Sequence, residues 1–203
     1  MKVWDVDIIS MSFGLWHPPS QGELEEWNRI LEDIKQTIRE AAPRIMFAAA
    51  SSCGKNNPRT FPSTRREVIC IHASDGNGND GGINPTNEDG DDNFMTLGIA
   101  VELVNDGKYF YKSGTSFATP IAAGIAANIL ELAARSKELT DRAKKQLKES
   151  EGMREMFRMM SKQDQRAPYR FIAPWRYWPR NWTADEHKVV SCWSAINAKF
   201  NHW

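Results

Sequence analysis

The segment YKSGTSFATPIAAG, residues 111–124, constrains the fold more than any other part of the sequence. A polar loop turns here into a helix with almost no side-chain bulk, because small residues dominate from Ala122 onward. Thr115 is expected to cap this helix, and Pro120 falls early enough to be tolerated near the first turn. Such a helix packs closely against other backbone, so the segment predicts a buried central helix.

Ser116 lies where this loop becomes a helix. A helix N-terminus offers free N–H groups and a partial positive charge, so a hydroxyl there lies beside a ready site for a developing oxyanion. A serine nucleophile needs that environment. The alternative is that Thr115 and Ser116 only cap the helix. Local spacing by itself leaves both interpretations open.

The segments before this helix predict an α/β fold with a mostly parallel sheet flanked by helices. Strands are expected over about residues 3–11, 44–50 and 68–73, which are short apolar runs. Between the first two strands, Ser20 and Glu23 have the spacing of a capping box. Apolar residues then follow at steps of three and four, which predicts one face of a helix: Leu24, Trp27, Leu31, Ile34 and Ile38.

Residues 74–93 are rich in Gly, Asn, Asp and Pro, and they predict a surface excursion. The spacing Asp75-x-Asn77-x-Asn79 invites a calcium interpretation. However, Asp80 stands where a calcium-binding loop has Gly, and Thr86 stands where it has a bidentate Glu. A turn-rich loop is therefore preferred, with a metal site as the alternative.

Charge and cysteine content give no sign of a special partner. The 203-residue chain has a net charge of zero, so neither nucleic acid nor a membrane is expected. Its three cysteines form no CxxC pair and indicate reduced thiols, with no disulfide framework, metal site or cofactor. The start lacks a secretory apolar region, and no apolar run approaches the roughly 20 residues that span a bilayer. We expect a soluble, intracellular protein.

The ordered motifs resemble those of the subtilisin-like serine peptidases, the subtilases. Their sequences look most similar to those of large fungal members of the family. SGTSFATP resembles the signature around their nucleophile, DIISMSFG their substrate-pairing strand, and IMFAAASSCG, FPS and VICIHASD the segments between. The resemblance covers about residues 3–132. It implies a subtilisin-like fold and peptide-bond hydrolysis through an acyl-enzyme on Ser116, with a His as base and an Asp that orients it.

The resemblance also implies which residues contact a peptide or protein substrate. Ser52 falls at the position of the family's oxyanion-hole Asn, where a hydroxyl is shorter than a carboxamide. The small side chains from Ala48 onward would leave room for a large substrate side chain before the cleaved bond. The expected substrate-binding residues come from two segments: Ser12, Phe13, Gly14, Ala49, Ala50 and Ser51.

The His and the Asp that would assist Ser116 are not found here within the motifs that carry them in the family. In the family, the Asp and His motifs precede the substrate-pairing strand. Here Asp5 and Asp7 lack the Asp motif, His17 lies in a Trp-His-Pro-Pro turn and His72 lies in a strand. We therefore expect residues 1–135 to be the carboxyl-terminal part of a catalytic domain, inactive alone, whose exposed edge strand promotes self-association. A non-catalytic interaction or regulatory module is the alternative.

Residues 136–203 predict a carboxyl-terminal helical and Trp-rich extension. The tail at 169–182 is expected to wrap the domain and bury Trp175 and Trp178, with an aromatic binding surface as the alternative. Apolar, methionine-rich side chains recur at helical spacing in this extension: Met153, Met156, Phe157 and Met160. Such a stripe is typical of a hydrophobic core rather than of a cofactor site.

Overall fold

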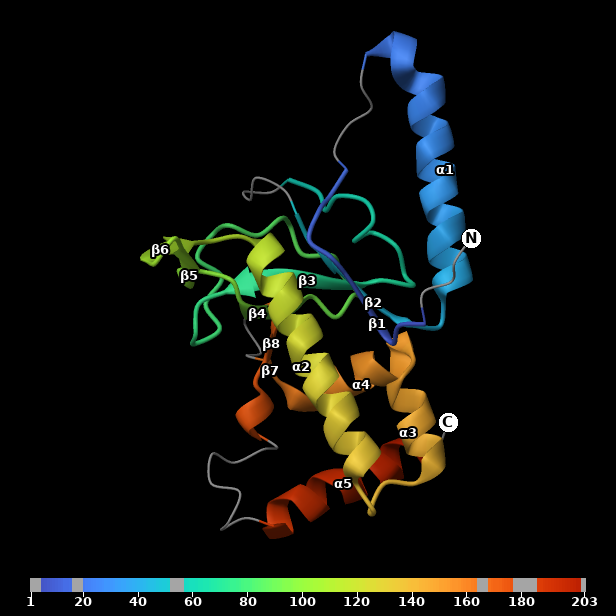
Figure 1. Ribbon diagram of the computed structural model, residues 1–203, viewed down its shortest axis with the longest axis vertical. Coiled ribbons are helices and arrows are strands. Elements are labelled where there is room, and N and C mark those ends of the chain that lie inside the picture. The colour runs from blue at the N-terminus through green and yellow to red at the C-terminus, as the bar shows by residue number, and fades with distance from the viewer. Residues whose placement is uncertain (1–4, 16–19, 52–56, 164–167, 177–185, 202–203) are drawn as a thin grey trace.

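The computed structural model describes residues 5–15, 20–51, 57–163, 168–176 and 186–201 (Figure 1). The strands are β1 (Ile8–Met11), β2 (Ile45–Ala49), β3 (Ile69–Ser74), β4 (Phe94–Leu97), β5 (Val101–Asn105), β6 (Lys108–Lys112), β7 (Ser161–Gln163) and β8 (Arg170–Ile172). The helices are α1 (Leu24–Ala41), α2 (Thr115–Arg135), α3 (Asp141–Leu147), α4 (Ser150–Met160) and α5 (Glu186–Asn201). Two short 3₁₀ turns are η1 (Gln21–Glu23) and η2 (Pro174–Arg176).

A six-stranded sheet in the order β1-β2-β3-β4-β8-β7 organises the molecule. The first five of these strands are parallel, and β7 pairs with β8 in the antiparallel sense. Every residue of β2 and β3 is buried, as expected for parallel strands covered on both faces. The predicted mostly parallel α/β sheet is therefore confirmed.

The first strand is shorter than the sequence predicts. It spans Ile8–Met11, and the residues from Asp5 to Asp7 lie outside it. Ile8 is in register with Ile45, the first residue of β2, so the strand begins where its partner begins. Within the described residues β1 pairs with β2 alone, which places it at the edge of the sheet.

Helix α2 lies against the sheet, as its small residues predict, and contacts β1, β2, β3 and β4 (Figure 1). Ala118, Ala122, Ala126 and Ile129 have no exposed surface. By length and composition alone, α2 is long and apolar enough to cross a membrane. This corrects the expectation that no apolar segment of the chain approaches the length needed to span a bilayer. Its buried face nevertheless belongs to the main hydrophobic cluster of the domain.

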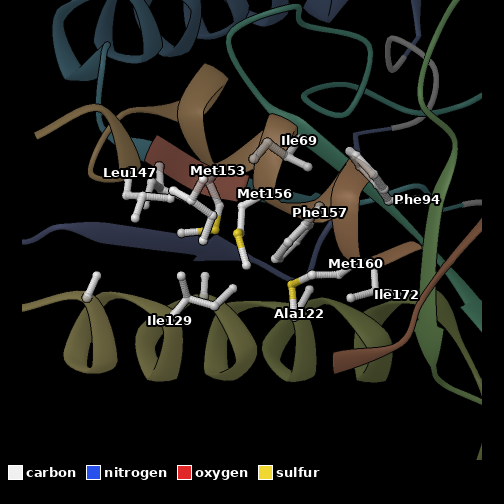
Figure 2. Close-up of a cluster of buried hydrophobic side chains, with 14 of the residues drawn as sticks. Ile69, Phe94, Ala122, Ile129, Leu147, Met153, Met156, Phe157, Met160 and Ile172 are labelled. Carbon is white, nitrogen blue, oxygen red and sulfur yellow. The ribbon is translucent and has the colours of Figure 1, made fainter. Parts of the chain in front are cut away.

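The methionine stripe of α4 packs in the same core (Figure 2). Met153, Met156, Phe157 and Met160 are fully buried, so the prediction of a core stripe is confirmed. The ring of Phe157 lies 5.6 Å from that of Phe47, stacked, and 5.6 Å from that of Phe94, edge-on. Figure 2 shows Met156, Phe157 and Met160 between α2 and the strands.

Helix α1 joins a hydrophobic cluster through its second half, where Ile34, Ile38 and Ala41 lie. Ile38 is buried, whereas Leu24 at the start of the helix is 39% exposed, and Figure 1 shows this end extending away from the sheet. The predicted capping box is also incomplete. The Ser20 hydroxyl donates to the Glu23 carboxylate at 3.0 Å and caps no backbone N–H, because η1 intervenes before α1.

The tail is less buried than the sequence predicts. Trp175 is 56% exposed and its ring lies 5.6 Å from that of Phe171, so the expected burial of Trp175 is wrong. Trp178 lies outside the described residues. Helix α5 packs in the main core through Cys192, Trp193, Ile196 and Phe200. Strands β7 and β8 join the same sheet as β1–β4.

Candidate active site

The loop after β2 meets the first turn of α2 at the carboxyl end of the sheet. Gly114 is the N-cap residue of α2 and Thr115 is its first helical residue. The backbone N–H of Ser51 donates to the Thr115 hydroxyl at 3.1 Å, and Thr115 is only 6% exposed. The expectation that Thr115 caps the helix is therefore wrong: its side chain binds a loop that precedes it by 64 positions.

Ser51 also contacts the segment that follows β1. A Cβ added to Gly14 would lie 2.7 Å from the Ser51 Cβ and 1.9 Å from the Thr60 hydroxyl oxygen, so only glycine fits there. The Thr60 hydroxyl donates to the Ser51 carbonyl at 3.3 Å. Ser51 itself has a φ of 43°, in the left-handed region that non-glycine residues rarely adopt. Three segments that the sequence analysis singled out thus converge at one point.

Ser116 is exposed at this point, as the second residue of α2. No side chain caps the helix, and within the described residues the Ser116 hydroxyl makes no hydrogen bond, so the interpretation of Ser116 as a cap is wrong. Pro120 has no N–H and leaves the Ser116 carbonyl without its partner in the helix. An exposed, unpartnered hydroxyl at the positive end of a buried helix is accessible to an electrophilic carbonyl, but it attacks one only when a general base takes its proton.

The remaining substrate-binding predictions fall into two groups. Ser12 and Phe13 are exposed, Phe13 by 47%, so their backbone is accessible to an extended peptide. Ala49 and Ala50 have no exposed surface, so a substrate side chain would reach them only after neighbouring residues move. Ser52, expected at the oxyanion position, lies outside the described residues.

His72 is the one histidine whose side chain the structure describes, and it cannot serve Ser116. It is fully buried in β3, with its Nδ1 3.1 Å from the Phe94 carbonyl oxygen and its ring 5.0 Å from that of Tyr169. Burial lowers the pKa of His72 to about 3. Its neighbour Ala73 packs in the cluster that contains α2, so the alternation of β3 turns His72 to the opposite face.

The acidic loop adopts turns without gathering ligands. The Asp75 carboxylate accepts hydrogen bonds from the side-chain amide of Asn79 at 2.8 Å and from the backbone N–H groups of Asn79 and Asn77, at 2.9 and 2.8 Å. These bonds, the side-chain one foremost, lower the pKa of Asp75. Within the described residues no group of three or more His, Cys, Asp or Glu side chains could hold a metal ion. Cys70 and Cys192 are free, and burial raises the pKa of each thiol to about 12.

Two residues for which the sequence predicted no role hold these segments together. Thr60 and Ser63 lie on a turn that supports the loop after β2: the Thr60 N–H donates to the Ala50 carbonyl at 3.3 Å, and the Ser63 hydroxyl donates to the Thr60 carbonyl at 2.6 Å. Hydroxyl residues are ordinary in turns, so nothing in their local sequence distinguishes them.

Comparison with known proteins agrees with this geometry. The family model Peptidase_S8, described as "Subtilase family", matches residues 4–164, and no curated protein matches. A similar solved structure is titled "Structure of Prenylagaramide maturation protease PagA". It shares 26% identity and a TM-score of 0.52, over 70% of this chain and 50% of that one. The chain thus spans about half the length of that structure. The family model matches most of this chain, residues 4–164, and the chain therefore belongs to the subtilase family.

Proposed function

We propose that this protein provides the nucleophile of a serine endopeptidase and that Ser116 is that nucleophile. The observation that carries the proposal is the exposed Ser116 hydroxyl at the start of buried helix α2, beside the loop that Thr115 holds. Membership of the subtilase family supports the same reaction class.

Each part of the proposed site has a physical task. The Ser116 oxygen gives its proton to a general base and attacks the substrate carbonyl; the peptide C–N bond then breaks, the amine leaves with that proton, and water later hydrolyses the acyl-enzyme. The backbone N–H of Ser116 stabilises the oxyanion, because the N–H of Phe117 already donates to the Gly114 carbonyl at 3.0 Å. The side chain of Ser52 is the candidate second donor. An extended substrate would pair with the backbone from Ser12 to Gly14, because that segment is exposed beside Ser51. No cofactor takes part in this scheme.

The scheme requires a general base within hydrogen-bond reach of the Ser116 oxygen, about 2.6–3.2 Å. Within the described residues His72 is buried on the other face of the sheet and no base contacts Ser116. This observation favours a second candidate function, in which the chain acts as a non-catalytic subtilase-like interaction module.

A fluorophosphonate probe distinguishes the two functions, because the oxygen of an activated serine attacks its phosphorus and displaces fluoride, which leaves a phosphonylated serine. We expect residues 1–203 alone to react slowly, and imidazole in solution to accelerate labelling of Ser116 by acting as the base that no described residue provides. Ser116→Ala should abolish the label, whereas Ser194→Ala, a change at an exposed serine in α5, should leave it intact. Labelling that shows no preference for Ser116 with or without imidazole would support the non-catalytic module.

A further inference from the structure

The hairpin formed by β5 and β6 exposes an apolar face that core packing does not explain. Val104 is 61% exposed, Tyr109 70% and Tyr111 63%. The register pairs Tyr109 with Val104 and Tyr111 with Glu102, so these side chains share one face, and the Tyr111 hydroxyl donates to Glu102 at 2.9 Å. A cluster of exposed apolar side chains is typical of an interaction surface.

The same hairpin has open edges. It is a two-stranded sheet separate from the main one, and all five residues of β6 are exposed. Two-stranded hairpins are marginally stable in isolation, and a third strand stabilises them. Within the described residues β6 pairs with β5 alone, so the N–H and C=O groups along its outer edge can pair with another extended segment.

Charge adds a second requirement for the occupant of that edge. Lys108 and Lys112 are exposed, and neither has an ion pair within the described part of the chain. Because side chains alternate along a strand, both lysines lie on the face opposite Tyr109 and Tyr111. Phe110, 36% exposed, lies between the lysines on that face. A strand paired with β6 would therefore meet the tyrosines on one face, and on the other two positive charges on either side of an aromatic ring.

The hairpin is fixed to the candidate active site. At its base the Gly114 N–H donates to the Gly98 carbonyl at 2.8 Å, and the Ala100 N–H donates to the Ser113 hydroxyl at 2.9 Å. The chain from Tyr111 to Ser116 can span at most about 17 Å when fully extended. A polypeptide bound at Ser116 can therefore reach β6 within a few residues of the bond that is cleaved.

We propose that the outer edge of β6 binds an extended segment of the polypeptide substrate in which apolar and acidic side chains alternate. Backbone pairing supplies affinity, while the tyrosines Tyr109 and Tyr111 and the lysines Lys108 and Lys112 select the alternating pattern. The identity of the occupant as substrate rests on the peptidase function proposed above. The site itself rests on the geometry and charge of the hairpin.

The test uses the full chain carrying Ser116→Ala and a fluorescein-labelled peptide of alternating Leu and Glu residues, with binding read as anisotropy. We expect the double variant Tyr109→Ser/Tyr111→Ser to weaken binding roughly tenfold, and Lys112→Glu to weaken it similarly. Matched controls remove an exposed aromatic residue or an exposed lysine elsewhere, and should bind as the parent does: Trp175→Ser and Lys162→Glu.

Two further peptides test the strand geometry. A peptide of the same composition with its Leu and Glu residues in separate blocks should bind more weakly. N-methylation of single residues should weaken binding at every second position, because only alternate N–H groups face β6. Equal affinity for both patterns, or hairpin variants that bind as the parent does, would overturn the proposal. If the double tyrosine variant does not fold, the binding affinity of Lys112→Glu decides whether the proposal stands.

Failure of the peptidase function has a separate signature. If the peptide binds with the expected pattern but Ser116 resists the fluorophosphonate probe with and without imidazole, the edge of β6 is a binding site for a partner other than a substrate. That result would overturn the identification of the occupant while leaving the strand-pairing site in place.

Discussion

The backbone N–H of Ser51 donates a 3.1 Å hydrogen bond to the hydroxyl of Thr115, and this bond joins the loop after β2 to the residue before the proposed nucleophile. Thr115→Val keeps the shape of the side chain but removes the acceptor, so we expect a loss of about 1 kcal/mol in the free energy of unfolding. Imidazole-assisted labelling of Ser116 should also slow, because the loop that carries Ser52 loses its anchor. Thr115→Ser retains the oxygen and should preserve both quantities; equal damage by both variants would contradict this role.

Gly14 is predicted to tolerate no side chain. In Gly14→Ala the new Cβ would lie 1.9 Å from the Thr60 hydroxyl oxygen, and overpacking of this kind costs about 1–3 kcal/mol. Urea unfolding should show a lower midpoint, and adding Thr60→Ala should recover part of the loss. Gly22→Ala is the matched control, since no atom lies within 4 Å of its Cβ position. A Gly14→Ala protein as stable as the control would refute the close approach.

Acid should destabilise the protein through Asp91. Burial acts to raise the pKa of Asp91, but the hydrogen bond from Arg59 and its charge outweigh burial, so the pKa falls below the ordinary value of 3.8. A carboxyl group with a lowered folded-state pKa contributes stability above its unfolded pKa and loses it as the pH falls through the folded value. We expect the urea midpoint to change little between pH 7 and pH 5 through this group.

The midpoint should then decline below about pH 4. Asp91→Asn should lower stability at neutral pH and reduce the slope of the acid decline. Glu26→Gln, a change at an exposed residue of α1, is the control for the loss of one carboxylate. An Asp91→Asn protein with the parent's full acid decline would show that other groups are responsible.

The edge of β1 is predicted to drive self-association of residues 1–203. β1 lies at the end of the sheet, and Val6, just before it, is 37% exposed beside the apolar surface of Ala127 and Leu130. Sedimentation velocity should show concentration-dependent association, which Ile8→Lys should suppress by placing a charge on the strand. Val6→Lys tests the same surface at a more exposed position. A sharp monomer that neither change affects would exclude this edge as the contact.

The sequence by itself predicted the elements whose signal is local. β2 and β3 are continuous apolar runs, the methionines of α4 recur at helical spacing, and the small residues after Thr115 mark a central helix. The structure confirms each of these because burial of apolar surface acts on the same residues that form the pattern. The resemblance of the motifs around Ser116 likewise identified the family that the comparison with known proteins shows.

Tertiary structure decided whatever depends on a partner distant in the sequence. β1 begins at Ile8 because β2 begins at Ile45, and the Thr115 hydroxyl accepts from Ser51 because the sheet brings β2 to the start of α2. Trp175 remains exposed on Phe171 although its size suggested burial. Composition and spacing describe what a residue prefers, whereas these outcomes depend on which surface the rest of the chain leaves open beside it.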